Sequence, residues 1–176
     1  MPMPMCSSSA SAALRADFLV TDVTKRVRPA GAGYPHGMAE KTLFGDEHVE
    51  RYRATDGEEG YRWRNDTTIL LLDTVGRKSG EPRTHPLIYR EIDGKPTIVA
   101  SKGGAPQHPA WYLNLFANPD DVEVQIKGDR FPVRPRVAEG EERERLWEAM
   151  VEVWPDYDGY QEKTDREIPV VVLERA

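Results

Sequence analysis

The sequence predicts an α+β domain built on a small, mostly antiparallel β-barrel with two or three helices. About six short segments are rich in β-branched and apolar residues over lengths typical of strands. Two pairs of these segments are separated by an Asp-Gly or Gly-Asp dipeptide of the kind found in tight hairpin turns. Two further segments carry apolar residues at helical spacing, so helices interrupt the strands. This combination favours a barrel with helices beside it.

The elements begin with a short helix, in which Phe44, Val49 and Tyr52 lie at roughly helical spacing and Gly57 follows the last turn. A second helix is expected at residues 108–118, because a proline stands near its first turn and Asn-Pro follows its last. A third is expected at 139–153, where acidic residues precede an apolar series.

The strands are expected at residues 67–75, 86–92, 95–101, 122–128, 130–137 and 169–175. Hairpin turns are expected at Asp93-Gly94 and at Gly128-Asp129. Proline cannot donate a hydrogen bond to a neighbouring strand, which confines it to edges or bulges. The strands are therefore expected to lie at a sheet edge or to form a bulge near Pro96, Pro132 and Pro135.

Composition excludes several classes of protein. The 176 residues suit one domain plus a tail, and a net charge of -6 argues against general affinity for nucleic acid. No apolar run approaches the roughly 20 residues of a membrane-spanning helix. A lone cysteine, Cys6, excludes an internal disulfide and a cysteine-based zinc site, and the four histidines lack metal-ligand spacing. We therefore expect no metal.

The chain divides into two parts. Residues 1–37, rich in Met, Pro, Ser and Ala, are expected to be a mobile N-terminal extension, and residues 38–176 to form the domain. The extension lacks the basic start of a secretory signal, so we expect a cytoplasmic location and leave open a peripheral contact with a membrane. The edges and exposed strands of the barrel provide a surface through which two chains can form a homodimer.

Three segments carry candidate chemistry. Arg77, Lys78 and Arg83 fall in a glycine-containing loop that can bind phosphate or carboxylate, although a solvated turn is the alternative. Ser101 and Lys102 precede a glycine pair that allows a ligand close to the backbone, or forms an ordinary connector. The third segment contains aromatic residues that either cover an apolar pocket or pack at its rim: Trp154, Tyr157 and Tyr160.

These segments together offer cations, glycines and aromatic rings but no strong acid–base pair. The helix at 108–118 adds Trp111 and Asn114 on neighbouring parts of one face, where aromatic residues are also common in a core. The sequence has no Gly-x-Ser-x-Gly motif and no nucleotide P-loop spacing. This profile suits a planar, anionic cofactor that carries the chemistry itself.

Three ordered blocks, LLLDTVGRKSGEPR, IVASKGGAPQHPAWYLNL and YDGYQEKTDREIPVVVLE, resemble the deazaflavin-dependent nitroreductase family. The resemblance extends over residues 44–175. It implies a split β-barrel related to FMN-binding barrels and coenzyme F420 as the cofactor. It also implies that F420H2 reduces a small electron-poor acceptor such as a quinone, an enone or a nitroaromatic compound by hydride transfer.

The resemblance also assigns roles to residues. The phosphate and oligoglutamate side of the cofactor would contact Arg77, Lys78 and Arg83, and Pro86 would lie beside the ring system. The deazaflavin and its ribityl arm would contact Ser101, Lys102, Trp111 and Asn114. Tyr157 and Tyr160 would close over the substrate, and Tyr157 and Ser101 would orient or protonate it.

Two departures from the family pattern affect the substrate side. Trp154 stands where relatives often have a tyrosine, and Ile88 stands where an aromatic residue is common. Activity on nitroimidazoles therefore does not follow from the resemblance. Two alternatives stay open: a non-catalytic F420-binding or storage protein, and a split-barrel protein that binds FMN or haem.

Overall fold

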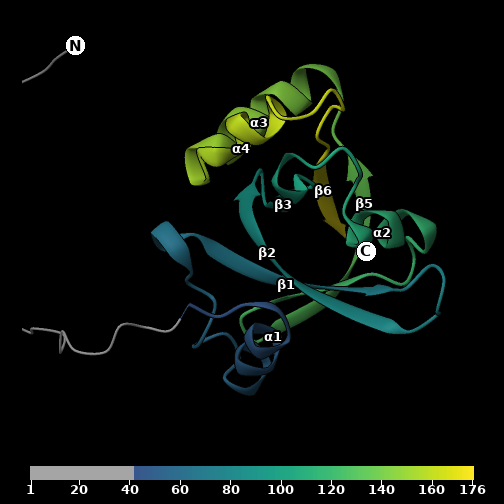
Figure 1. Ribbon diagram of the computed structural model, residues 1–176. Coiled ribbons are helices and arrows are strands. Elements are labelled where there is room, and N and C mark those ends of the chain that lie inside the picture. Colours follow the sequence, from purple (N-terminus) through teal and green to yellow (C-terminus); the bar gives the residue numbers. More distant parts are fainter. Residues whose placement is uncertain (1–41) are drawn as a thin grey trace, which may run out of the picture. The chain divides into compact units, whose positions relative to one another are not determined.

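Six antiparallel strands form a closed barrel in the computed structural model, which describes residues 42–176 (Figure 1). The order around the barrel is β1-β2-β3-β6-β5-β4. The strands are β1 (Thr68–Val75), β2 (Pro82–Ile92), β3 (Lys95–Val99), β4 (Glu123–Ile126), β5 (Asp129–Val137) and β6 (Val170–Arg175). The predicted fold class is confirmed, whereas the extension predicted at 1–37 lies outside the described residues.

The described part of the chain has four α-helices, more than the two or three expected. They are α1 (Gly45–Ala54), α2 (Ala110–Ala117), α3 (Gly140–Val153) and α4 (Asp156–Gln161), and two 3₁₀ turns are η1 (Arg64–Asp66) and η2 (Lys102–Gly104). The additional helix is α4, which contains the turn-favouring pair Asp158-Gly159 and yet is helical because its Tyr157 packs against α3. Within residues 42–176, each helix is too short or too polar to cross a bilayer.

The hairpin between β2 and β3 has the predicted turn. Ile92 pairs with Lys95, and the two residues between them, Asp93 and Gly94, have φ of 53° and 73°. Positive φ at both central residues is the geometry whose twist matches that of the strands.

The hairpin between β4 and β5 turns one residue earlier than predicted. Ile126 pairs with Asp129, so the turn is Lys127-Gly128 rather than Gly128-Asp129. Lys127 accepts a left-handed φ of 53°, and its carbonyl is bound by the side-chain amide of Gln125 at 2.8 Å. The hydrogen bond from Gln125 fixes the turn at Lys127-Gly128, although the sequence favours Gly128 as the first residue of the turn.

The three prolines each pair with a neighbouring strand. Pro96 pairs with β2, Pro132 pairs with β4, and Pro135 pairs with β6. Pro132 is not at an edge, because its carbonyl also accepts a hydrogen bond from the Ala176 amide at 3.1 Å, on the side of β6. Proline cannot donate the return bond, and the pairing of β5 with β6 ends at this position.

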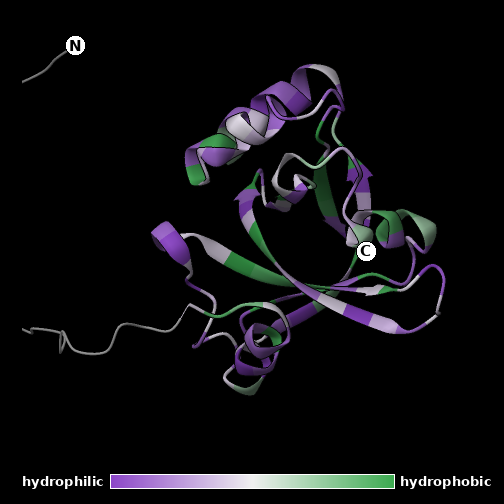
Figure 2. Cartoon of the chain, in the orientation of Figure 1, coloured by the Kyte–Doolittle hydropathy of each residue, from purple (hydrophilic) through white to green (hydrophobic). Residues whose placement is uncertain are grey.

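Apolar side chains form three clusters on the sheet, and the smallest of them packs Tyr52 of α1 against Ile69 and Leu71 of β1. The barrel interior is packed with residues that include Leu70, Leu72, Ile98, Val124 and Leu173. The opposite face of β3 and β6 packs against α3 and α4 through a second cluster that includes Val99, Met150, Tyr157 and Ile168. Hydrophobic residues accordingly follow the strands at the centre, while the loop between β1 and β2 is hydrophilic (Figure 2).

The Tyr52 hydroxyl joins α1 to the barrel. It donates to the Ile69 carbonyl at 3.0 Å and accepts from the Lys127 amide at 2.8 Å, and burial raises the pKa of this phenol to about 12. Tyr52→Phe should lower the free energy of unfolding by about 1–3 kcal/mol, because a buried amide loses its acceptor. Urea denaturation measures this loss, and Tyr112→Phe is the control because no described residue hydrogen-bonds to that hydroxyl. Equal losses in the two variants would contradict the prediction.

Candidate functional site

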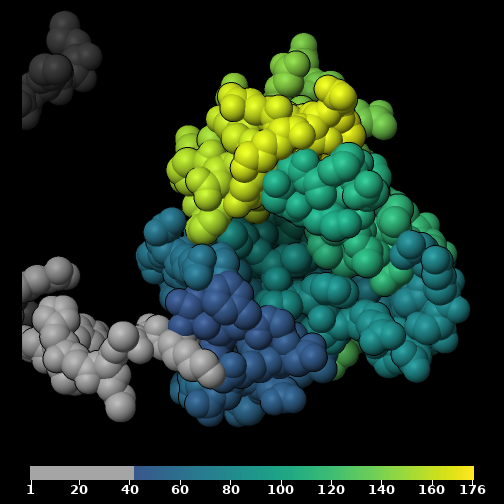
Figure 3. All heavy atoms as spheres, in the orientation of Figure 1, coloured from purple at the N-terminus to yellow at the C-terminus, as the bar shows by residue number. Residues whose placement is uncertain are grey.

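A cavity of about 440 Å³ opens beside the barrel, where side chains from segments far apart in the sequence meet. It appears in Figure 3 as a hollow between the blue segment around α1, the teal strands and the yellow-green segment around α4. Its walls carry an unusual concentration of aromatic side chains. These are Phe44, Trp63, Trp111, Trp154, Tyr157 and Tyr160.

Most of the predicted site residues lie in these walls. The cavity brings together Pro86, Ile88, Ser101, Lys102, Trp111, Trp154, Tyr157 and Tyr160. The remaining predicted residues lie outside its walls: Arg77, Lys78, Arg83 and Asn114. The structure thus separates the predicted site into an aromatic cavity and a cationic loop.

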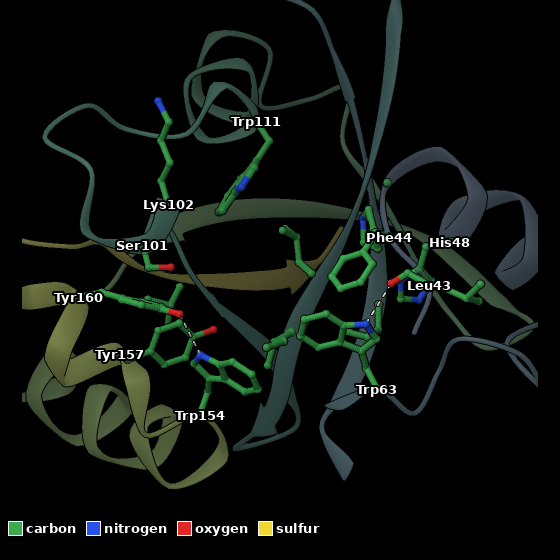
Figure 4. Close-up of a pocket in the computed structure, with 17 residues that line it drawn as sticks. Leu43, Phe44, His48, Trp63, Ser101, Lys102, Trp111, Trp154, Tyr157 and Tyr160 are labelled. Atoms are coloured by element: carbon green, nitrogen blue, oxygen red, sulfur yellow. Dashed lines mark hydrogen bonds between the residues drawn. The ribbon is translucent and has the colours of Figure 1, made fainter. Parts of the chain in front are cut away.

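One wall of the cavity is the turn that follows β3. Lys102 and Gly103 both have left-handed backbones, with φ of 49° and 65°, so the Lys-Gly-Gly sequence suits this tight turn. Gly104 then lies directly against α4, where an added Cβ would stand 2.5 Å from the Tyr160 carbonyl oxygen. Ser101 enters the cavity from the end of β3, and the Lys102 side chain extends past Trp111 (Figure 4).

Helix α4 forms the adjoining wall. Tyr157 and Tyr160 are three residues apart and therefore share a face of the helix. Tyr157 is 5% exposed, and this burial, with a smaller contribution from Tyr160, raises the pKa of its phenol above the ordinary value. The Tyr160 hydroxyl accepts a hydrogen bond from Trp154 Nε1 at 3.5 Å. The Tyr157 hydroxyl points toward the cavity (Figure 4) and keeps its proton at neutral pH.

The opposite wall comes from the segment before β1 and was missed by the sequence analysis. Trp63 packs against Trp154, with ring centroids 5.8 Å apart, and its Nε1 donates to the Leu43 carbonyl at 3.0 Å (Figure 4). Phe44 meets the Trp63 ring edge-on at 5.6 Å, and the Arg64 guanidinium lies over the same ring. A tryptophan between two arginines immediately before a strand was the available signal.

The cationic loop between β1 and β2 is attached to the helix that carries Trp111. Asn114 lies one turn after Trp111 on α2, is 6% exposed, and accepts through Oδ1 from the Arg77 amide at 3.2 Å and from Arg77 Nη1 at 3.1 Å. Lys78 is exposed, and exposed Arg83 pairs with Glu81 at 2.8 Å. The loop is therefore linked through Asn114 to the helix that contributes Trp111 to the cavity wall.

A second cavity, of about 410 Å³, differs in chemistry. Its lining has two arginines and four carboxylates, and both arginines are already paired: Asp73 binds Arg53 at 2.7 Å and Arg130 at 3.1 Å, and Arg130 also binds Glu123 at 2.8 Å. The cavity is therefore acidic overall and does not suit a ligand with a negatively charged tail. The aromatic cavity is the better candidate.

The aromatic cavity can hold a flat ring system and protect it from water. Its titratable lining groups are His48, Lys102, Tyr157 and Tyr160, and His48 is committed to the Gly60 carbonyl at 2.8 Å. Acid–base chemistry there thus falls to the Lys102 ammonium group, the two phenols, the Ser101 hydroxyl and water. Flat apolar walls with cations at one side fit a planar cofactor that has an acidic tail.

Comparisons with known proteins agree with this arrangement. Residues 45–175 match the family model described as F420H(2)-dependent quinone reductase. An F420H(2)-dependent quinone reductase of Mycobacterium tuberculosis is 43% identical over 131 residues, which cover 73% of this chain and 87% of that protein.

Two solved structures are also similar. One, an F420-H2 dependent reductase (FDR-A), is 50% identical over 60% of this chain and 93% of its own, with a TM-score of 0.55. Another, described as a domain-swapped dimer, is 45% identical over 73% of this chain and 95% of its own, with a TM-score of 0.58. The chain belongs to the family of F420H(2)-dependent quinone reductases.

Proposed function

We propose that this protein reduces a quinone with F420H2 and that the reaction takes place in the aromatic cavity. Membership of the family confirms the expected class, an oxidoreductase, and the expected cofactor, reduced coenzyme F420. The observation that carries the proposal is that α2 connects the aromatic cavity to the cationic loop: its Trp111 lines the cavity and its Asn114 binds Arg77 of the loop. When bound, the reduced deazaflavin supplies a hydride. The protein's own groups bind the cofactor, orient the quinone and supply the proton that it takes up.

The cationic loop binds the acidic handle of the cofactor. Arg77, Lys78 and Arg83 are exposed within seven residues, and guanidinium groups bind phosphate and carboxylate in a bidentate manner. The Asn114 side chain holds the Arg77 backbone. Both hydrogen bonds of Asn114 Oδ1 go to Arg77, so the expected contact with the ribityl arm falls to Nδ2 of the same side chain.

The acceptor lies on the side of Trp63, Trp154 and Ile88. The two indoles pack against each other and form an aromatic wall along which a planar ring can lie, and aromatic contacts add to the free energy of burial. Reduction of a quinone takes up one hydride and one proton and gives a hydroquinone, so a proton donor must lie nearby. Enones and nitroaromatic compounds are further acceptors to be compared with quinones.

Tyr157 is the strongest candidate for the proton donor, with Ser101 beside it. Its hydroxyl faces the cavity and carries its proton at neutral pH, although burial raises the pKa of this phenol and so makes it a weaker acid than a free tyrosine. Tyr157→Phe should lower kcat by on the order of 100-fold and leave the Kd for F420 almost unchanged. Steady-state kinetics and a titration measure the two quantities, and Tyr112→Phe is the control because Tyr112 lies outside the cavity walls. Unchanged kcat in Tyr157→Phe would remove it from this role.

Anaerobic oxidation of F420H2, followed by absorbance, tests the proposed function. We expect a menaquinone-like quinone to accelerate oxidation more than cyclic enones or nitroaromatic compounds do. Tight binding of F420 without acceleration by any acceptor would favour a storage protein. Preferential binding of FMN or haem to the purified protein would overturn the cofactor assignment.

A homodimer is the expected assembly, supported by the solved relative described as a domain-swapped dimer. Light scattering coupled to size-exclusion chromatography measures the mass in solution. A monomer at all concentrations would contradict this expectation.

A further inference from the structure

Arg166 lies outside the cavity walls, in the segment between α4 and β6, yet it binds the turn that forms one of them. Its Nε donates to the Ala105 carbonyl at 2.8 Å, and its Nη2 donates to the carbonyls of Ser101 at 2.7 Å and Ala100 at 3.2 Å. One guanidinium thus binds the backbone on both sides of η2. Charge-assisted hydrogen bonds of this kind are stronger than neutral ones.

The segment that carries Arg166 is itself fixed to α4. Gln161, the last residue of α4, donates through Nε2 to the Arg166 carbonyl at 2.8 Å. Its Oε1 accepts from the Ile168 amide at 2.9 Å. Arg166 therefore connects the wall made by α4, with Tyr157 and Tyr160, to the wall made by the turn, with Ser101 and Lys102.

The turn needs such support because of its backbone. Lys102 is a non-glycine residue with φ of 49°, a conformation that persists where surrounding contacts fix it. The peptide planes at Ala100, Ser101 and Ala105 cannot rotate without breaking bonds to the guanidinium. Ser101 and Lys102 are also the residues that enter the cavity from this turn.

We infer that Arg166 is a positioning residue: its guanidinium holds the turn at 101–105 so that Ser101 and Lys102 face the bound cofactor. The inference rests on the proposed function for its kinetic consequence, but the effect on the turn does not depend on any ligand. The Arg166 side chain does not line the cavity, so it does not touch a bound ligand directly. It acts through the backbone of the turn.

Arg143 provides a matched control. It is also an arginine bound to the segment before β6, since Nη2 donates to the Ile168 carbonyl at 3.2 Å and Nε pairs with Glu167 at 3.3 Å. Its contacts within the described part of the chain do not include the turn. Arg143→Gln therefore weakens the same segment without releasing the three carbonyls.

The first measurement is made on the unliganded protein by NMR. Arg166→Gln should shift the amide signals of Gly103 and Gly104, whereas Arg143→Gln should leave them near their wild-type positions. Arg166→Lys, which keeps one charged donor, should give intermediate shifts and serves if the glutamine variant does not fold. Wild-type signals in both Arg166 variants would overturn the inference, whatever the protein's function.

The second measurement is a double-mutant cycle on the Kd for F420 and on kcat/KM. Arg166→Gln should lower kcat/KM by on the order of 100-fold, with partial recovery in Arg166→Lys and values close to wild type in Arg143→Gln. Lys102→Ala should weaken F420 binding less in the Arg166→Gln background than in wild type. Additive effects would overturn the inference. Failure of wild-type protein to bind F420 would instead contradict the proposed function, and the NMR result would still decide the role of Arg166.

Discussion

Gly104→Ala is expected to lower the free energy of unfolding by about 2–5 kcal/mol and to abolish measurable binding of F420. The new Cβ would lie 2.5 Å from the Tyr160 carbonyl oxygen and 2.9 Å from Lys163 Cβ, at a position where φ is +81°. The nearest of these atoms belongs to the backbone of α4, so the helix must move and take Tyr157 with it. Urea denaturation and a titration with F420 measure the two effects.

Gly94→Ala separates the clash from the backbone strain. Gly94 also has a positive φ, +73°, but an added Cβ there would meet no atom within 4 Å. This variant should lose about 1 kcal/mol and bind F420 normally. Equal losses of stability at the two glycines, with F420 binding intact in both, would show that α4 does not depend on the close approach at Gly104.

Asn114→Ala is expected to have the second-largest effect, because it removes the acceptor that holds the cationic loop. The Arg77 amide and guanidinium would both lose their bond to Oδ1. We expect a loss of about 1–3 kcal/mol in stability. We also expect F420 affinity to fall by about tenfold or more, equivalent to roughly 1.4 kcal/mol. Denaturation and titration again provide the measurements.

Two variants control for this prediction. Asn114→Asp keeps an oxygen acceptor at the same place and should retain most of the affinity for F420. Asn118→Ala removes a different contact of the same helix end, the 3.3 Å bond from Nδ2 to the Val75 carbonyl, and should affect the loop less. Equal effects of Asn114→Ala and Asn118→Ala would mean that the position of the loop does not depend on Arg77.

The fold was predictable because its signals are local. Each strand was found from its own β-branched residues, and the turn at Asp93-Gly94 was found from its own dipeptide. The second hairpin shows where this fails, because Lys127 is held by Tyr52 and Gln125, and the former is 75 positions away in the sequence. Helix α4 was missed for the same reason, since packing against α3 outweighs Asp158-Gly159.

The candidate site was predictable where its residues occur in motifs. Ser101, Lys102, Trp111 and Tyr157 come from such blocks and line the cavity. The contribution of Trp63 was not predictable, because it depends on a contact with Trp154. The partner of Asn114 was likewise hidden, since helical spacing shows which face a residue occupies but not what approaches it from a loop 37 positions earlier.

The tryptophans give this protein an internal optical reporter. Of the four in the sequence, Trp63, Trp111 and Trp154 line the cavity, and Trp147 packs its ring against Tyr157 at 6.1 Å. Every indole in the chain therefore lies in the cavity wall or touches a residue of that wall. Ultraviolet emission from the unlabelled polypeptide should respond directly to occupancy of the cavity, by cofactor or by acceptor, without any attached dye.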